Sequence, residues 1–226
     1  MPYSSAAGGL LVKADSSIKN INDLEGKEVG VAGGSLDKSW LFFRAFCIKQ
    51  YNKDPLKFFK ASFAAPPLIN GLILNGELNG AINYWNYTAR LEAEGLKKIL
   101  DIKEILPSLG IKGDLPLIGY VFDENFEKSN PKLISSFLNA SLDARNILNT
   151  SDAEWYRIKD LTGAKDNLML EKLRDGFRKG IPDSDFNETK EALGKAYQIL
   201  EEIGGRKLVG NSKKLQTGTL WKKVYK

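Results

Sequence analysis

The sequence contains no histidine and only one cysteine, Cys47, among its 226 residues. Without histidine, the chain cannot build Ser-His or Cys-His nucleophile pairs, histidine zinc sites or histidine general bases. A single cysteine excludes an intramolecular disulfide and a cysteine metal cluster. Because Cys47 lies in the apolar stretch 40–47, we expect a buried structural thiol rather than a nucleophile.

Known catalytic and phosphate-binding motifs are absent as well. The chain has no Walker A loop, no G-x-S-x-G and no G-x-G-x-x-G. An enzyme built from this sequence would have to use carboxylates or lysine without a familiar motif. We therefore predict a protein that is not an enzyme, with no catalytic residues, no metal site and no cofactor.

Long hydrophobic runs are missing too. No apolar run approaches the roughly 18 residues of a membrane-spanning helix, and residues 1–5 resemble no export signal. The formal charge is +5, but 33 Lys and Arg are interspersed with 28 Asp and Glu. Because this surplus forms no basic stripe and matches no known motif, we expect no nucleic-acid partner.

Short strands alternate with helices in the first half of the chain. This alternation predicts a parallel sheet with right-handed crossovers. One helix is expected over about 36–51 with Ser35 as its N-cap, and another from Pro66-Pro67 to about Asn75-Gly76. The strands are predicted at 8–14, 27–32, 57–62, 80–84 and 97–100, with a third helix at 87–95.

The second half of the sequence is predicted to contain one strand, 116–122, followed almost entirely by helices. A helix opens at 129–131, a capping box stands at 151–154, and further helices are expected at about 165–179 and 185–203. These helices have apolar faces but little predicted sheet to cover. We therefore expect residues such as Phe137 and Leu138 to be partly uncovered.

Several short motifs resemble those of type II periplasmic binding proteins. Residues 17–31, SIKNINDLEGKEVGV, resemble the stretch S-I-K-x-x-x-D-L-x-G-K-x-V-x-V of that class. Residues 76–85, GELNGAINYW, resemble the G-E-L-D-A segment of the nitrate/sulfonate/taurine (NMT1-like) group, with Asn79 where the group often has Asp. Residues 126–131 and 204–221 resemble later parts of the same group. The motifs occur in the order and with the spacing of that group. Together, they make the resemblance extend over nearly the whole chain.

The resemblance implies an α/β fold of the periplasmic-binding-protein-like (type II) class, in which two lobes close on a ligand. Lobe two, with the parallel sheet, is expected at 15–110, and the helix-rich remainder of lobe one at 1–14 and 111–226. Such proteins normally begin with a signal peptide and several βα units of lobe one. The chain is therefore expected to be a fragment that lacks the N-terminal part of lobe one.

The resemblance also implies a role in transport. It predicts the substrate-binding component of an ABC importer, which captures a small anionic or sulfonate-like solute in the cleft between the lobes. The expected partners are this solute and the permease subunits in the membrane. The full-length protein is expected to be a periplasmic or lipid-anchored extracytoplasmic monomer, with its export signal upstream of residue 1.

Two other functions are left open by the sequence. Some NMT1-like proteins bind or synthesise pyrimidine precursors, and the synthases consume a histidine of their own, which this chain lacks. Ligand-sensing effector domains share the type II fold but usually follow a helix-turn-helix, and none is recognisable here.

Ligand contacts are expected where a strand ends next to a helix start. Gly33, Gly34 and Ser35 join a predicted strand to a helix whose free N–H groups would suit an anion. The alternative is that they form only a turn and a cap. Asp37 could also occupy this helix end, in which case a zwitterionic or cationic ligand is expected.

The neighbouring strand ends supply the other candidate contacts. A polar and aromatic cluster there could hold a ligand by stacking and amide hydrogen bonds. Packing in the hinge or core is the alternative for Trp85. The candidates are Phe63, Ala64, Asn83, Tyr84 and Trp85, together with Tyr3 and Ser4 at the crossover between the lobes.

Overall fold

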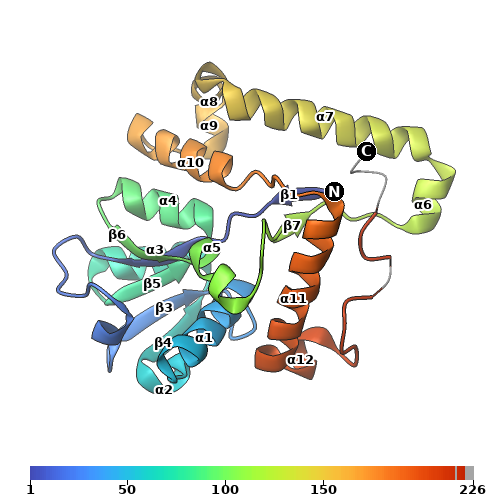
Figure 1. Cartoon of the computed structure of the whole chain (residues 1–226). Helices are drawn as coiled ribbons and strands as arrows, with labels where there is room; N and C mark the ends of the chain where they lie inside the picture. The colour runs from blue at the N-terminus through green and yellow to red at the C-terminus, as the bar shows by residue number, and fades with distance from the viewer. Residues whose placement is uncertain (217, 222–226) are drawn as a thin grey trace.

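The computed structural model describes residues 1–216 and 218–221 and shows two lobes (Figure 1). The lower lobe contains a five-stranded sheet with the order β4-β3-β5-β2-β6. The upper lobe contains the two-stranded sheet β1-β7 beneath the long helix α7. The strands of the lower sheet are β2 (Gly9–Val12), β3 (Glu28–Ala32), β4 (Lys60–Ala64), β5 (Gly80–Asn83) and β6 (Lys97–Asp101).

The lower sheet is mixed rather than fully parallel. Strands β3, β4 and β5 run parallel, as the alternation of strands and helices predicts. Strand β2 runs antiparallel to both β5 and β6, which the alternation did not predict. The reason is that the chain enters β2 from the upper lobe, at the edge where the parallel strands end. Because β2 belongs to this sheet, residues 9–12 lie with the strands of 15–110.

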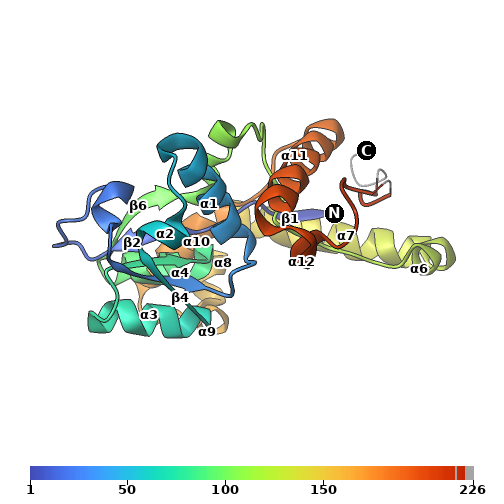
Figure 2. The same cartoon turned by 90° about the horizontal axis from the view of Figure 1, so that it is seen from below.

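Alternating side chains divide the core of the lower lobe between the two faces of the sheet. Leu10, Val29 and Val31 pack on the face covered by α1 (Lys38–Tyr51). Leu11 and Ala81 pack on the opposite face with Ile69 and Ile73 of α3 (Pro66–Asn75). This period of two is the expected pattern for a sheet that is buried on both sides. Figure 2 shows α1 and α3 on opposite sides of the sheet.

Two predicted element starts are wrong. Helix α1 begins at Lys38 with Asp37 as its N-cap, so Ser35 lies outside the helix. The strand predicted at 57–62 begins only at Lys60, as β4, because residues 57 and 58 belong to the short helix α2 (Pro55–Phe58). Asp54 caps α2, and Pro55 stands at its first position, where proline favours a helix.

Helix α3 starts at Pro66 and ends at Asn75, as predicted, with Gly76 at a φ of 83°. Helix α4 (Trp85–Ala93) starts two residues earlier than the predicted 87.

The upper lobe is built from β1 (Pro2–Ser4), which pairs with β7 (Ile118–Gly119), and from the helices that follow. Strand β7 is much shorter than the predicted 116–122. In the described ranges, no helix is both long and apolar enough to cross a membrane. The remaining helices are α5 (Ile102–Ile105), α6 (Glu124–Ser129), α7 (Pro131–Thr150), α8 (Asp152–Arg157), α9 (Lys159–Thr162), α10 (Asn167–Lys179), α11 (Phe186–Gly204) and α12 (Arg206–Val209).

Two of the C-terminal helices, α10 and α11, make contacts with the lower lobe. Met169 and Leu173 of α10 pack with Ala89 of α4. Ala196 of α11 shares a core with Trp40 of α1. These contacts join elements far apart in sequence, so part of 111–226 packs with the lobe predicted at 15–110.

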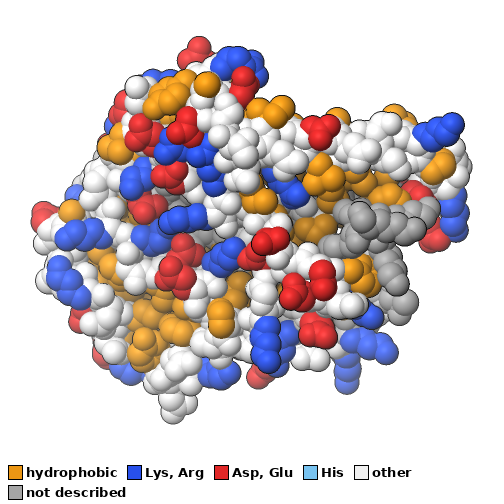
Figure 3. All heavy atoms as spheres, turned by 45° about the horizontal axis from the view of Figure 1, so that its top comes forward, with side chains coloured by type: hydrophobic (Ala, Val, Ile, Leu, Met, Phe, Trp, Pro, Cys, Tyr) orange, Lys and Arg blue, Asp and Glu red, His pale blue; other side chains and the backbone are white. Residues whose placement is uncertain are grey.

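Apolar side chains remain exposed on the upper lobe. Phe137 of α7 is half-exposed, as expected, whereas Leu138 is buried. Ile118 of β7 and Leu133 of α7 are also half-exposed, and Val121 is 94% exposed. Figure 3 shows hydrophobic side chains along the long upper helix.

Cys47 is buried in α1, as the sequence predicts. Burial, together with the charge of Asp54, raises the pKa of its thiol to about 12. The reactive thiolate is therefore expected to be scarce near neutral pH, at a fraction on the order of one in a hundred thousand. We predict that a thiol reagent at mildly alkaline pH labels Cys47 only after unfolding in guanidinium chloride. Rapid labelling of the native protein, followed by absorbance, would contradict this burial.

Candidate functional site

The ends of the three parallel strands meet at one edge of the lower lobe. The N–H group of Gly33, after β3, donates to the carbonyl of Ala64 at the end of β4 over 2.8 Å. The side-chain amide of Asn83, at the end of β5, donates to the carbonyl of Pro66 over 2.9 Å. We call residues 33–38, 64–66 and 83–84 the strand-end edge. The structure thus brings together most of the predicted contact residues, from three separate strands.

Asn83 links separate segments of the strand-end edge by hydrogen bonds. It is buried, and its Nδ2 also donates to Oδ1 of Asn70 over 2.8 Å. Its Oδ1 accepts from the N–H of Tyr84 over 2.8 Å. Because these bonds use both ends of the amide, the observed role of Asn83 is to fix the start of α4 against the start of α3.

Asp37 is the central polar group of the edge. Its Oδ1 accepts from the N–H groups of Ser39, at 2.9 Å, and Trp40, at 3.2 Å. The prediction that Ser35 caps this helix and leaves its N–H groups free is therefore wrong, because a carboxylate occupies the position expected for an anion. The sequence allowed for this outcome, since an aspartate just before a helix is a common cap.

The second oxygen of Asp37 binds Tyr84. Oδ2 accepts from the Tyr84 hydroxyl over 3.1 Å. Burial and the nearby charge of Asp37 raise the pKa of Tyr84 to about 12, so this phenol stays neutral at physiological pH. Gly33 allows the contact: its φ is 82°, and an added Cβ would lie 2.7 Å from the Tyr84 hydroxyl oxygen.

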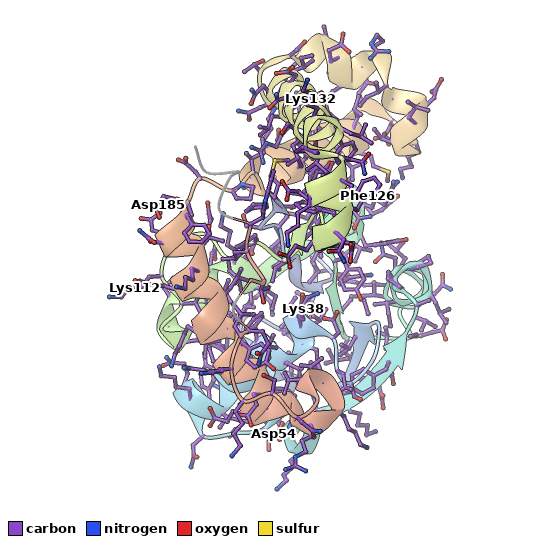
Figure 4. The ribbon with its side chains drawn as sticks, turned by 90° about the vertical axis from the view of Figure 1, so that its right-hand side faces the viewer. Lys38, Asp54, Lys112, Phe126, Lys132 and Asp185 are labelled. Atoms are coloured by element: carbon purple, nitrogen blue, oxygen red, sulfur yellow. The ribbon has the colours of Figure 1, made fainter. Side chains whose placement is uncertain are left out.

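Gly34 and Ser35 are exposed at the same edge, and a Cβ at Gly34 would have open space around it. Lys38, which the sequence analysis did not select, is also exposed and comes from the first position of α1. Figure 4 shows Lys38 on the side of the lower lobe that faces α6 and Phe126. No ion pair of Lys38 occurs among residues 1–216 and 218–221.

Phe63 directly precedes the strand-end edge on β4. Its ring is in edge contact with the indole of Trp40, with centroids 5.7 Å apart, and its side chain is partly exposed. The ring therefore packs on the α1 face of the sheet. Ala64, the last residue of β4, is half-buried at the edge itself.

Trp85 points away from Asp37 and Tyr84, towards α10. A Cβ at Gly176 of α10 would lie 3.0 Å from Cε3 of Trp85. The indole also lines a separate polar cavity of about 130 Å³. In that cavity the ammonium of Lys98 lies 3.3 Å from carboxylates of both Glu92 and Asp101. Burial acts to lower the pKa of Lys98, but the two carboxylates outweigh it and raise the pKa.

Tyr3 and Ser4 lie on β1 in the upper lobe. The Tyr3 ring makes edge contacts with Tyr120, at 5.5 Å, and Phe177, at 6.4 Å. Ser4 is buried, and its Oγ accepts from the N–H of Ala6 over 3.1 Å. Both side chains thus have internal partners that the sequence did not reveal.

A larger cavity, of about 570 Å³, lies elsewhere in the upper lobe. It is lined by β7, α6 and residues 218–221, and it contains none of the predicted contact residues. Its position next to the exposed apolar side chains of β7 makes it distinct from the strand-end edge.

The strand-end edge offers groups that can form hydrogen bonds or an ion pair with a polar solute. Its polar groups are a carboxylate, a phenol, a primary amine and backbone amides. In the part of the chain that the structure describes, no three Cys, Asp or Glu side chains are grouped to hold a metal ion.

Solved structures of similar shape include two sulfonate-binding proteins. The periplasmic aliphatic sulphonate binding protein SsuA from Escherichia coli has a TM-score of 0.72 and 16% identity, over 100% of this chain and 72% of that chain. The alkanesulfonate-binding protein SsuA from Xanthomonas axonopodis pv. citri, bound to MOPS, has a TM-score of 0.68 and 12% identity, over 97% and 71%. These similarities confirm the predicted two-lobe, periplasmic-binding-protein-like fold.

The desulfurization enzyme DszB is also similar, with a TM-score of 0.52 and 14% identity over 88% of this chain and 70% of that chain. The fold therefore occurs in binding proteins and in an enzyme.

No curated protein sequence matches the chain significantly. Residues 3–149 match the family described as NMT1/THI5 like. Because this match spans more than half of the sequence, the chain belongs to the NMT1/THI5-like family.

Proposed function

We propose that the protein is the substrate-binding component of an ABC importer and holds a small solute between its two lobes. The observation that carries the proposal is the convergence of three strand ends on an exposed edge that faces the upper lobe. In open α/β sheets, ligands bind outside the carboxyl ends of the strands. The periplasmic SsuA protein of Escherichia coli, which has a similar fold, supports a place outside the cytoplasm.

The proposed solute carries an acidic group, such as a sulfonate. Lys38 is an exposed cation at the strand-end edge. We assign the acidic group to Lys38, because the N–H groups at the start of α1 are already bonded to Asp37. An ammonium is a suitable point-charge partner for a sulfonate or carboxylate. The two SsuA proteins are described as binding sulfonates, which supports this class.

The proposed protein releases its solute unchanged, as a monomer that presents its closed form to permease subunits. Support comes from the absence of histidine and from the edge's lack of an activated nucleophile. Calorimetric titration with a series of alkanesulfonates tests binding, and mass spectrometry of the recovered solute tests turnover. Absence of binding across the series would exclude the sulfonate proposal, and a desulfonated product would favour an enzyme.

A charge placed at Gly34 tests where the acidic group lies. The open space around Gly34 admits a side chain without a clash. In Gly34→Asp, repulsion is expected to weaken binding of an alkanesulfonate by about tenfold or more, equivalent to about 1.4 kcal/mol. Gly34→Asn is the matched neutral control and is expected to bind much more tightly than the Asp variant. Equal affinities of the two variants in calorimetry would place the acidic group elsewhere.

A further inference from the structure

Three segments of the chain lie side by side where the two lobes meet. Residues 5–8 join β1 to β2, and residues 110–117 lead from the lower lobe to β7. Residues 179–185 connect α10 to α11 beside them. We call these three ranges the hinge segments. The N–H of Ser5 donates to the carbonyl of Gly180 over 2.7 Å, which joins two of them directly. A change in the angle between the lobes has to be absorbed by these segments.

Lys103, on the short helix α5 of the lower lobe, contacts all three hinge segments. Its ammonium forms an ion pair with the carboxylate of Asp114 at 2.6 Å. The same nitrogen donates to Oγ of Ser5 over 3.3 Å and to the carbonyl of Lys179 over 3.2 Å. An ammonium has three N–H donors, so these three partners account for all of them. Each partner belongs to a different hinge segment.

Ser5 and Asp114 are themselves bonded to the third hinge segment. Ser5 is buried, and its hydroxyl donates to the carbonyl of Gly180 over 3.2 Å. Oδ2 of Asp114 accepts from the N–H of Asp183 over 3.0 Å. The N–H of Asp114 donates to Oγ of Ser184 over 3.0 Å. The ammonium is therefore the centre of a hydrogen-bond network that includes every hinge segment.

The position of this network indicates that it acts on geometry more than on folding. The hinge segments are closely packed: an added Cβ at Gly180 would lie 2.6 Å from Cβ of Ala6. The ion pair itself is more open, with 37% of the Lys103 side chain and 18% of the Asp114 side chain exposed. Exposed ion pairs contribute little to the free energy of unfolding. Loss of the ammonium is therefore expected to change the relative position of the hinge segments and to leave each lobe folded.

We propose that Lys103 is a positioning residue, whose ammonium fixes the angle between the two lobes and so prepares the cleft for its solute. The part that concerns the solute rests on the proposed function, whereas the restraint on the lobes does not. Lys103 lies outside the strand-end edge, so it acts on affinity through the hinge segments. Two lobes that are already held in position lose less conformational freedom when they close on a solute.

Spin labels on α2 and α7 measure the relative position of the lobes without any solute. The sites are Lys57→Cys and Lys132→Cys, both exposed, in the full chain with Cys47→Ala. Figure 1 shows these helices in the lower and the upper lobe. In Lys103→Met, we expect pulsed electron paramagnetic resonance to give a distribution of label distances that is roughly twofold wider. An unchanged width would overturn the proposal.

Asp114→Asn tests the same network from the other partner. Asparagine keeps the shape of the side chain and an oxygen that can accept from the backbone, but it removes the charge opposite the ammonium. The distribution of label distances is expected to widen to a smaller degree than in Lys103→Met. This variant carries the test if Lys103→Met does not fold, and an unchanged width would then overturn the proposal.

Lys98→Met is the matched control. The ammonium of Lys98 also lies 3.3 Å from two carboxylates, but those of Glu92 and Asp101 both belong to the lower lobe. Its loss is expected to lower the urea midpoint of unfolding and to leave the distribution of label distances unchanged. If Lys98→Met widened the distribution as much as Lys103→Met does, the effect would be a general loosening of the lower lobe, and the proposal would be wrong.

Calorimetric titration with ethanesulfonate tests the effect on the solute. We expect Lys103→Met to bind roughly 3- to 10-fold more weakly than the wild type, the effect of about one lost hydrogen bond, and Lys98→Met to bind as the wild type does. Equal or tighter binding by Lys103→Met would overturn the role in preparing the cleft. Failure of the wild type to bind any alkanesulfonate would overturn the proposed sulfonate function, and the label distances would still decide whether Lys103 fixes the lobes.

Discussion

Replacement of Gly8 with alanine is expected to prevent stable folding of the lower lobe. Gly8 has a φ of 83°, and an added Cβ would lie 2.0 Å from the carbonyl oxygen of Asn83 and 2.8 Å from the backbone nitrogen of Trp85. Both contacts are with backbone, so no side chain can rotate away. The clash and the positive φ together should lower the free energy of unfolding by about 4 kcal/mol or more.

The Gly8 prediction is checked by urea denaturation and by the soluble yield of the variant. Gly71→Ala is the matched control, because nothing lies within 4 Å of its added Cβ and it stands inside helix α3. Alanine there should raise stability by about 0.5–1 kcal/mol. A Gly8→Ala protein as stable as the wild type would show that β2 does not lie tightly against the start of α4.

Gly8 also connects stability to the candidate site. Its carbonyl accepts from the N–H of Ile102 over 3.0 Å, so the chain is fixed on both sides where it passes between the lobes. The nearby carbonyl of Ala7 accepts from the hydroxyl of Ser39 over 3.3 Å, which ties this segment to the first turn of α1. Partial unfolding around Gly8 is therefore expected to disturb Asp37 and Tyr84 together.

Local signals in the sequence predicted those elements that depend on local chemistry. Pro66-Pro67 and Gly76 bound α3 as predicted, because proline favours a first turn and glycine readily adopts the left-handed conformation after a last one. The parallel pairing of β3, β4 and β5 followed from their alternation with helices. Because parallel strands end on the same side of a sheet, this pairing also predicted that their ends would meet at one edge.

The structural features that the sequence did not predict depend on contacts between residues that lie far apart in the chain. Trp85 is turned by α10, whose Gly176 lies about ninety residues later in the chain, so no local pattern indicated its direction. The antiparallel β2 and the packing of α11 on α1 likewise depend on how the lobes are connected. Asp37 was named as a possible occupant of the helix end, but only the structure shows that it excludes Ser35 as the cap.

Trp40→Ala is expected to have the second large effect on stability. The indole of Trp40 is fully buried and stacks with Phe43 at 5.9 Å. It also contacts Phe59 at 6.0 Å and Phe63 at 5.7 Å. Its removal leaves a cavity between α1 and the sheet, so unfolding in urea should show a loss of about 3–5 kcal/mol. A loss below about 1 kcal/mol would show that this core closes around the smaller side chain.

Trp40→Phe separates the packing of the ring from its hydrogen bonding. The buried Nε1 of Trp40 has no hydrogen-bond partner within residues 1–216 and 218–221. Phenylalanine keeps an aromatic ring and removes an unsatisfied N–H group, whose burial is itself unfavourable. We therefore expect Trp40→Phe to lose less than about half of what Trp40→Ala loses. Because Trp40 follows Asp37 by one helical turn, solute binding should survive in the Phe variant and weaken in the Ala variant. Equal losses of stability in the two variants would instead indicate that the indole N–H has a partner.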